Sequence, residues 1–309
     1  MAVRTTYPGV YIEEIPSGVR TITGVGTSIT AFVGRAARGP VSEPTTVFSF
    51  ADFERTFGGL WPDSTMSYAV RDFYANGGSQ AIIVRLARNG APAVIPLPTN
   101  ALTLEAASPG TWGNNLSATV DYNTKDPTDT NLFNLTVSEA GGAVEKFLNL
   151  SIVSTNARFA PHVLEQSSNL VRVQNAVVNA RPDAVTTSAT PNSGGDGDVL
   201  ATGDFTGPGM QDNKTGIYAL EKADLFNLLC LPPFGRGGDM AATVYQDAMA
   251  YCVSRRAMLL VDPPAAWSAN KETAAATALA GLSALGHTGD GARNAALYFP
   301  PLTEADPLR

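Results

Sequence analysis

VRTITGVGTSITAFVG, residues 19–34, ends in an apolar run between Ile29 and Val33. A short run of this kind is typical of a strand that is buried on both faces of a sheet. The pair Gly24 and Gly26 lacks the third glycine of a dinucleotide-binding fingerprint, and it leads into a strand instead of a helix. The stretch therefore predicts a buried strand and argues against a nucleotide-binding turn.

The residues that follow predict two helices and a second buried strand. Ser49 and Asp52 have the spacing of a capping box, and Phe50, Phe53 and Phe57 fall on one face of a helix that Gly58 ends. A second helix is expected between a cap at Ser64 and a stop at Gly77. Residues 81–86, AIIVRL, read as a continuous apolar strand. Residues 19–91 are thus predicted to be the first part of an α/β core.

Residues 92–190 have a different composition, rich in Pro, Thr, Asn and Gly, without helical periodicity. They predict a β-rich inserted domain with short strands and a hairpin across residues 140–142. A short helix at 158–165 and a further strand at 170–173 make its end hard to place. The four clearest strands are expected at residues 102–105, 116–122, 133–139 and 144–151.

Residues 191–309 return to alternating helices and strands and predict the second part of the α/β domain. Such alternation favours an α/β fold with a mostly parallel sheet and helices on its faces. In chain order the expected elements are a helix at 217–222, a strand at 225–231, a helix at 239–256, a strand at 257–261, a helix at 270–285 and a strand at 295–299.

The N-terminal residues 1–18 predict an extended strand arm followed by a hinge. YPGVYIEEI, residues 7–15, places Tyr7, Tyr11 and Ile15 on one face of a strand and Val10 and Ile12 on the other, and Pro16, Ser17 and Gly18 follow it. Because neither face is purely polar, the strand is expected to be covered on both sides. It can pair within its own domain, which loop length favours, or with a sheet edge of a neighbouring molecule.

Several ordered segments resemble the sheath protein of contractile phage tails and of related contractile injection systems. In chain order they are YPGVYIEEIPSG, TSITAFVGRAARGP, FADFERTFGG, YAVRDFYANGG, GGDGDVLATGDF, GIYALEKADLFNLLCLPP, RAMLLVDPPAAW and NAALYFPPL. The resemblance covers nearly the whole chain and is weakest across the β-rich insertion.

The resemblance implies a structural subunit, not an enzyme, that polymerises helically around an inner tube and contracts to drive the tube through a target envelope. Its partners would be further copies of itself, the inner tube protein, and baseplate and terminator proteins. It would be assembled in the bacterial cytoplasm as part of a virion tail or a phage-tail-like particle. The resemblance also implies that the arm pairs between subunits. Sheath proteins usually continue into a C-terminal domain beyond LYFPPLTEADPLR, so we expect a fragment or a shortened relative.

Composition argues against nucleic-acid binding, membrane insertion and metal binding. With 21 Lys and Arg against 28 Asp and Glu, a net charge of -7 argues against a nucleic-acid partner, which needs a basic surface. No signal peptide and no apolar run of spanning length is seen, so no direct membrane insertion is expected. Cys230 and Cys252 lie in apolar contexts typical of core thiols, and the two histidines, His162 and His287, have no ligand spacing. No metal or other cofactor is expected.

Some fragments mimic catalytic motifs, and two other functions stay open. Residues 207–215 lack the glycine before lysine that a P-loop needs. Ser268 and Lys271 match the S-x-x-K motif of penicillin-recognising enzymes, but the K-T-G match at residues 214–216 precedes it, which is the wrong order. Asp196, Asp198 and Asp204 favour an ordinary turn over a calcium site. Asp262, at a predicted strand end, is the best candidate if the chain is an α/β enzyme or a nucleotide-binding protein. A non-contractile scaffold or baseplate-linked relative is the third possibility.

Overall fold

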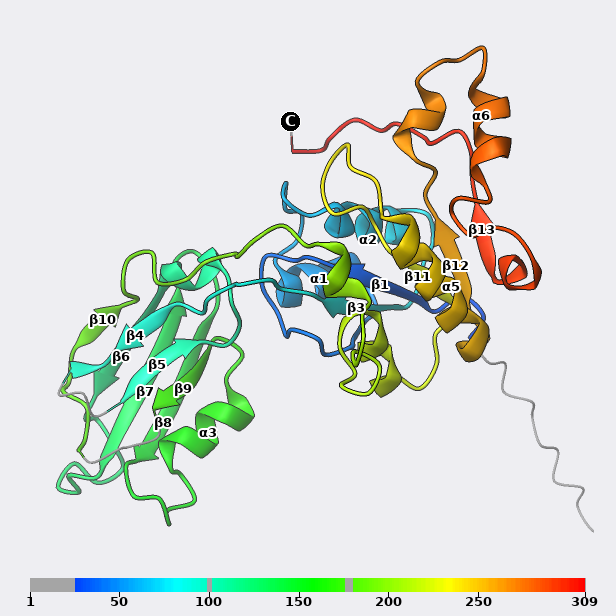
Figure 1. Ribbon diagram of the computed structural model, residues 1–309. Helices are drawn as coiled ribbons and strands as arrows, with labels where there is room; N and C mark the ends of the chain where they lie inside the picture. Colours follow the sequence, from blue (N-terminus) through cyan, green and yellow to red (C-terminus); the bar gives the residue numbers. More distant parts are fainter. Residues whose placement is uncertain (1–25, 99–101, 176–179, 309) are drawn as a thin grey trace, which may run out of the picture.

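The computed structural model describes residues 26–98, 102–175 and 180–308, which form two lobes of a mixed α/β protein (Figure 1). The first lobe, called the α/β lobe, holds a six-stranded sheet in the order β13-β12-β11-β1-β3-β2. Five strands run parallel and β2 runs antiparallel to β3. These strands are β1 (Thr30–Gly34), β2 (Thr45–Val47), β3 (Ala81–Arg85), β11 (Leu228–Cys230), β12 (Met258–Val261) and β13 (Ala295–Leu297).

The central strands β1 and β3 are buried at every position. Their side chains alternate between two apolar clusters, as expected for a strand covered on both faces. Phe32 packs with α1 (Phe50–Phe57) and α2 (Thr65–Ala75), whereas Ala31 and Val33 pack with α5 (Ala242–Arg255). Helices therefore cover both faces of the sheet around β1.

Helix α1 begins and ends as its sequence predicts. The Ser49 side chain accepts a hydrogen bond from the N–H of Asp52 at 3.1 Å, and Gly58 ends the helix with φ 92° in the left-handed region. Helix α2 differs. Ser64 precedes it but makes no capping bond, because its hydroxyl donates instead to the carbonyl of Arg35. Ser64 is therefore the N-cap residue that the sequence predicts, but its side chain does not make the capping hydrogen bond.

Several elements of the second half are shorter than their patterns predict. Residues 217–222 are helical but form a 3-10 helix, η3 (Gly216–Lys222), and β11 keeps only the middle of the expected strand. Helix α6 (Ala274–Gly281) covers half of the predicted 270–285. It ends where Gly281 packs on Trp267, and a Cβ at Gly281 would lie 2.4 Å from that ring. The remaining short helices are α4 (Thr202–Phe205), η4 (Ala265–Ser268) and η5 (Asp290–Asn294).

The second lobe, called the β-rich lobe, has two antiparallel sheets around one apolar cluster that runs from Ala93 to Ala189. The hairpin expected across residues 140–142 joins β7 to β8, and α3 (Ala160–Ser167) packs beside β9. One sheet holds β4 (Val94–Pro96), β5 (Thr103–Ala106) and β9 (Val171–Asn175); the other holds β10 (Thr186–Ser188), β6 (Leu116–Asp121), β7 (Leu132–Glu139) and β8 (Val144–Ser151), and η2 (Thr111–Asn115) precedes β6.

Candidate functional site

The predicted arm and hinge lie outside the described residues. This holds for every residue that the sequence assigned to intersubunit pairing or to the hinge, namely Tyr7, Val10, Tyr11, Ile12, Ile15, Pro16, Ser17 and Gly18. Their strand pairing stays a prediction. The described residues offer three other places to look for function: the carboxyl edge of the large sheet, its outer end at α6, and the junction of the two lobes.

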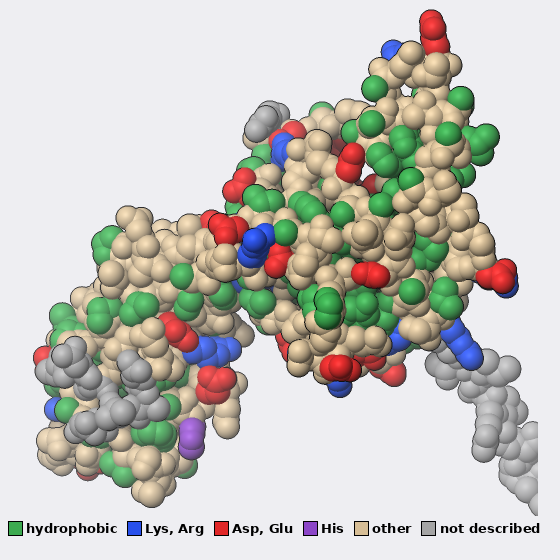
Figure 2. Space-filling view, in the orientation of Figure 1, with side chains coloured by type: hydrophobic (Ala, Val, Ile, Leu, Met, Phe, Trp, Pro, Cys, Tyr) green, Lys and Arg blue, Asp and Glu red, His purple; other side chains and the backbone are tan. Residues whose placement is uncertain are grey.

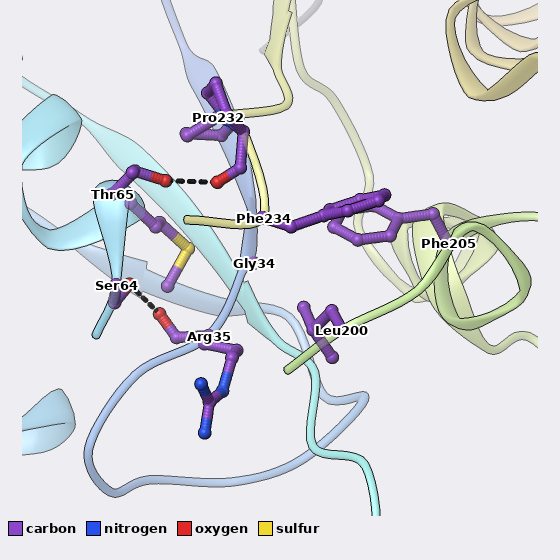
Figure 3. Close-up of a pocket in the computed structure, with 10 residues that line it drawn as sticks. Gly34, Arg35, Ser64, Thr65, Leu200, Phe205, Pro232 and Phe234 are labelled. Carbon is purple, nitrogen blue, oxygen red and sulfur yellow. Dashed lines mark hydrogen bonds between the residues drawn. The ribbon is translucent and has the colours of Figure 1, made fainter. Parts of the chain in front are cut away.

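The carboxyl edge of the parallel strands is where α/β proteins usually bind ligands. Figure 3 shows side chains that line this edge between the ends of β1 and β11. The cavity between the ends of β1 and β11 measures about 10 Å³, room for about one water molecule. The rings of Phe205 and Phe234 lie 5.2 Å apart across it, and the Thr65 hydroxyl donates to the carbonyl of Pro233. This cavity has no space for a nucleotide or a comparable substrate.

Asp262 follows β12 at the same edge, but it does not line that cavity. Its side chain is exposed, and its backbone N–H donates to the Tyr245 hydroxyl at 3.1 Å. Burial raises the pKa of the Cys230 thiol well above its ordinary value, and it raises the pKa of Cys252 to about 12. Both thiols are therefore protonated at neutral pH and are poor nucleophiles. Desolvation by the surrounding protein also raises the pKa of the Asp262 carboxyl above its ordinary value.

The acidic turn that could have suggested calcium binding is engaged in local hydrogen bonds. Asp196 accepts from the N–H and the hydroxyl of Thr111, and Asp198 accepts from the side chain of Asn89 at 2.7 Å. Asp204 accepts from the N–H of Ala201. Within residues 26–98, 102–175 and 180–308, no group of three or more His, Cys, Asp or Glu side chains could hold a metal ion. In the same ranges, no helix is long and apolar enough to cross a membrane.

The outer end of the large sheet carries an exposed apolar surface, defined here as the α6 surface. Helix α6 projects from the α/β lobe, and most of its residues are exposed although the helix is rich in alanine; Ala278 is buried. Leu279, Tyr298 and Leu302 are 73%, 74% and 98% exposed. Figure 2 shows hydrophobic side chains gathered over this projection. Contiguous exposed apolar groups are typical of a surface that another protein covers.

The last described residues cross the outer side of α2 as an extended segment. Arg71 pairs with Glu304, and Arg236 pairs with Asp306 at 2.6 Å. The Arg236 guanidinium also lies 4.7 Å from the centre of the Tyr68 ring. Hydrogen bonds from Arg236 hold the pKa of Asp306 at about 2, below its ordinary value of 3.8. Side-chain ion pairs on the surface therefore contribute to holding this segment, and such pairs are weak individually.

The lobes are joined by a neck, defined here as residues 88–91 and 195–198 (Figure 1). The two segments pair as antiparallel bridges between Arg88 and Asp198 and between Ala91 and Gly195. Gly197 has φ 71°, and a Cβ there would lie 2.1 Å from the carbonyl of Arg88, so this close approach requires glycine.

Two arginines of the α/β lobe hold the neck and the loop that follows β1. Arg35 donates to the carbonyls of Asp196 and Gly197. Arg85, which is 2% exposed, donates to the carbonyl of Gly39 and, across the lobe boundary, to that of Pro109, both at 2.7 Å. Burial lowers the pKa of Arg85 to about 10, so it remains charged at neutral pH. The charge strengthens its bonds to the carbonyl oxygens.

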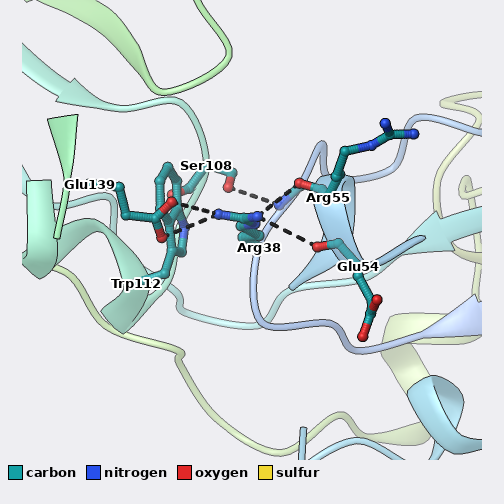
Figure 4. A network of polar contacts seen from close by, with 7 residues as sticks. Arg38, Glu54, Arg55, Ser108, Trp112 and Glu139 are labelled. Atoms are coloured by element: carbon teal, nitrogen blue, oxygen red, sulfur yellow. Dashed lines mark hydrogen bonds and ion pairs between the residues drawn. The ribbon is translucent and has the colours of Figure 1, made fainter. Parts of the chain in front are cut away.

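A second connection lies beside the neck and is called the clasp (Figure 4). Arg38 of the α/β lobe donates to both carboxylate oxygens of Glu139 at the end of β7, at 3.0 and 3.2 Å. Its other terminal nitrogen donates to the carbonyl of Arg55 in the last turn of α1. The guanidinium lies 5.9 Å from the centre of the Trp112 ring, and the N–H of Gly39 donates to the Ser108 hydroxyl.

No motif or periodicity in the sequence singled out the clasp residues. Arg38 lies within TSITAFVGRAARGP, but Glu139 stands 101 residues later at the end of an ordinary hairpin strand. No spacing rule connects two residues on different lobes. Only the return of the chain through the neck brings them together.

Comparison with known proteins identifies similar folds. A crystal structure of a sheath tail protein from Listeria innocua aligns with a TM-score of 0.54 and 15% sequence identity, over 78% of this chain and 48% of that chain. One from Desulfitobacterium hafniense aligns with a TM-score of 0.49 and 16% identity, over 82% and 52%. No protein-family model and no curated protein matches. The chain spans about half the length of these sheath tail proteins, and its fold is similar to that of the Listeria innocua protein, as the sequence resemblance predicted.

Proposed function

We propose that this chain is a structural subunit of a contractile tail sheath that polymerises helically around an inner tube. The observation that carries the proposal is the similarity of its fold to the sheath tail protein of Listeria innocua. The ordered segments that resemble sheath proteins support the same assignment independently of the fold. The chain is assembled in the bacterial cytoplasm, and its partners are further copies of itself, the inner tube protein, and baseplate and terminator proteins.

The described surfaces support a role in assembly over a role in catalysis. The α6 surface presents apolar side chains that a partner would cover, whereas the carboxyl edge near β11 leaves about 10 Å³. The small volume disfavours a nucleotide between β1 and β11, and an α/β enzyme or nucleotide-binding protein with a site near Asp262, at the end of β12, stays the alternative. Within the proposal, the α/β sheet is the mostly parallel core, residues 92–190 are the inserted domain, and the arm pairs with a neighbouring subunit.

Electron microscopy of native particles from producing cells tests the proposal directly. Negative staining is expected to show striated tubes in two lengths, extended and contracted, with this polypeptide identified in them by mass spectrometry. Short stacks or rings would indicate a non-contractile scaffold instead. Soluble monomers that bind a defined ligand stoichiometrically would overturn the proposal.

The arm is tested separately by deleting residues 1–15. Because main-chain hydrogen bonds of an added strand supply affinity between subunits, the deletion is expected to abolish polymerisation. The circular dichroism spectrum and the unfolding transition of the α/β lobe should stay unchanged, since the described strands of its sheet begin at Thr30. Tubes formed by the shortened chain would refute the role of the arm while leaving the sheath assignment in place.

A further inference from the structure

The junction of the two lobes has the features of an adjustable joint. We propose that the clasp between Arg38 and Glu139 sets the orientation of the β-rich lobe, and that opening the clasp lets this lobe swing about the neck. The inference concerns the chain by itself and does not depend on the sheath role. Four observations carry it: separate cores, an anchored arginine, a cleft beside it, and the partial exposure of the ion pair.

The two lobes do not share an apolar core. The clusters of the α/β lobe contain no residue from 92–190, and the cluster of the β-rich lobe runs from Ala93 to Ala189. The contacts described across the boundary are polar, among them Arg85 with Pro109 and Gly39 with Ser108. Lobes that meet through a small polar interface are expected to move relative to each other unless specific contacts hold them.

Arg38 is fixed to the α/β lobe. Its backbone N–H donates to the carbonyl of Phe57, and its guanidinium donates to the last turn of α1 through the carbonyls of Glu54 and Arg55. Glu139 is fixed to the other lobe by the hairpin turn, where its N–H donates to the carbonyl of Ala143. Arg38 and Glu139 therefore each move with their own lobe, and the ion pair between them couples the positions of the two lobes.

A cleft of about 740 Å³ lies beside the clasp, and both lobes line it. Arg38 and Thr56 face it from the α/β lobe, and Trp112, Glu139 and Arg172 face it from the β-rich lobe. Protein interiors are otherwise packed with few voids larger than a water molecule. The cleft thus gives the β-rich lobe room to move toward or away from α1 without disturbing either core.

The ion pair is strong enough to bias the joint and weak enough to open. The Arg38 and Glu139 side chains are 22% and 16% exposed. Solvent therefore screens the attraction between their charges less than in a fully exposed pair, but water and salt still reach both groups. Breaking it does not strip Arg38 of its partners, because the α1 carbonyls remain. By contrast, Arg35 and the neck bridges stay in place and act as the pivot.

Distances between spin labels on the two lobes test the clasp in the whole chain. Labels on Asp247→Cys of α5 and Lys146→Cys of β8 occupy exposed positions on rigid elements of different lobes. The native chain, which lacks the two introduced cysteines, is the control for labelling of the native thiols, of which Cys252 is buried and Cys230 is half-buried. Replacing Glu139 by alanine is expected to widen the distance distribution at least about twofold, since the neck and the hydrogen bonds of Arg85 with Pro109 and of Gly39 with Ser108 are then left to restrain the lobe.

The matched control is Glu165→Ala, which removes a carboxylate from an ion pair with Arg172 inside the β-rich lobe. It should leave the distribution unchanged. Salt provides a second test. As NaCl rises to about 1 M, where the Debye length is about 3 Å, the distance distribution of the native chain should widen. The distribution of the Glu139→Ala chain should not change with salt. A native distribution that is insensitive to salt, or equal widening in both variants, would overturn the proposal.

Discussion

The two lobes differ in how far apart along the chain their pairing residues lie. In the α/β lobe, Thr30 of β1 pairs with Leu228 of β11, and the N–H of Ile29 donates to the Asn227 side chain 198 residues away. In the β-rich lobe, β6, β7 and β8 pair with their chain neighbours. Closing a short loop costs less conformational entropy than closing a long one. The β6-β7-β8 part of the β-rich lobe is therefore built from local contacts, although β5 pairs with β9 and β6 with β10 across longer loops. The α/β lobe depends on the chain returning through the neck.

Each lobe keeps its own apolar cluster, so damage in one lobe should stay in that lobe. Phe133 of β7 is fully buried, and its replacement by alanine is expected to cost about 3–5 kcal/mol of unfolding free energy through the cavity it leaves. Hydrogen exchange should show lost protection in β6, β7 and β8 while β1 and β3 keep theirs. Val144→Ala, at an exposed position of β8, is the control and should change stability by less than about 0.5 kcal/mol. Joint loss of protection in both lobes would mean that they unfold as one unit.

The long-range closure of the α/β lobe is tested at Asn227. Removing its side chain with Asn227→Ala leaves the N–H of Ile29 without its acceptor, and a partly buried donor left unpaired costs about 1–3 kcal/mol. The loss should appear as weaker protection of β1 and β11, measured by hydrogen exchange, with the β-rich lobe unaffected. Asn227→Asp keeps an acceptor oxygen and should retain more of the stability. If the two variants behave alike, the hydrogen bond is not what joins the two halves of the sheet.

A smaller loss of stability is expected from removing the N-cap of α1, which is a local contact within the α/β lobe. Ser49→Ala removes the N-cap of α1 and should cost about 1 kcal/mol in urea unfolding. Ser49→Thr preserves a capping hydroxyl and is expected to lie close to the native chain. Equal destabilisation by both substitutions would show that the side chain matters for packing and not for the cap.

The smallest effect concerns the segment that crosses α2. The pKa of Asp306 is about 2 in the folded chain and 3.8 ordinarily, so its pairing with Arg236 favours the folded state above pH 3.8 and is lost as the pH falls through about 2. Carboxyl chemical shifts followed by NMR should report the low pKa, and Arg236→Ala should return it toward 3.8. A titration unchanged by Arg236→Ala would place the cause elsewhere.

Local patterns in the sequence predicted the elements whose residues stabilise one another within a few positions. The buried strands at 30–34 and 81–85, the capped helix at 50–57 and the hairpin joined across 140–142 all follow from periodicity and turn chemistry. The predictions were less accurate for α2, whose expected cap at Ser64 bonds elsewhere, and for α6, which ends early against Trp267. In both cases a distant side chain or loop competes with the local rule.

The sequence by itself determined the α/β class, the change of composition at residue 92 and the resemblance to sheath proteins, because these depend on residue order alone. Tertiary structure alone decided that the cavity between β1 and β11 is small, that most of α6 is exposed, and that Arg38 meets Glu139. Each of these depends on where segments about a hundred residues apart come to lie. Such distances are set by the packing of whole elements, and no short pattern records them.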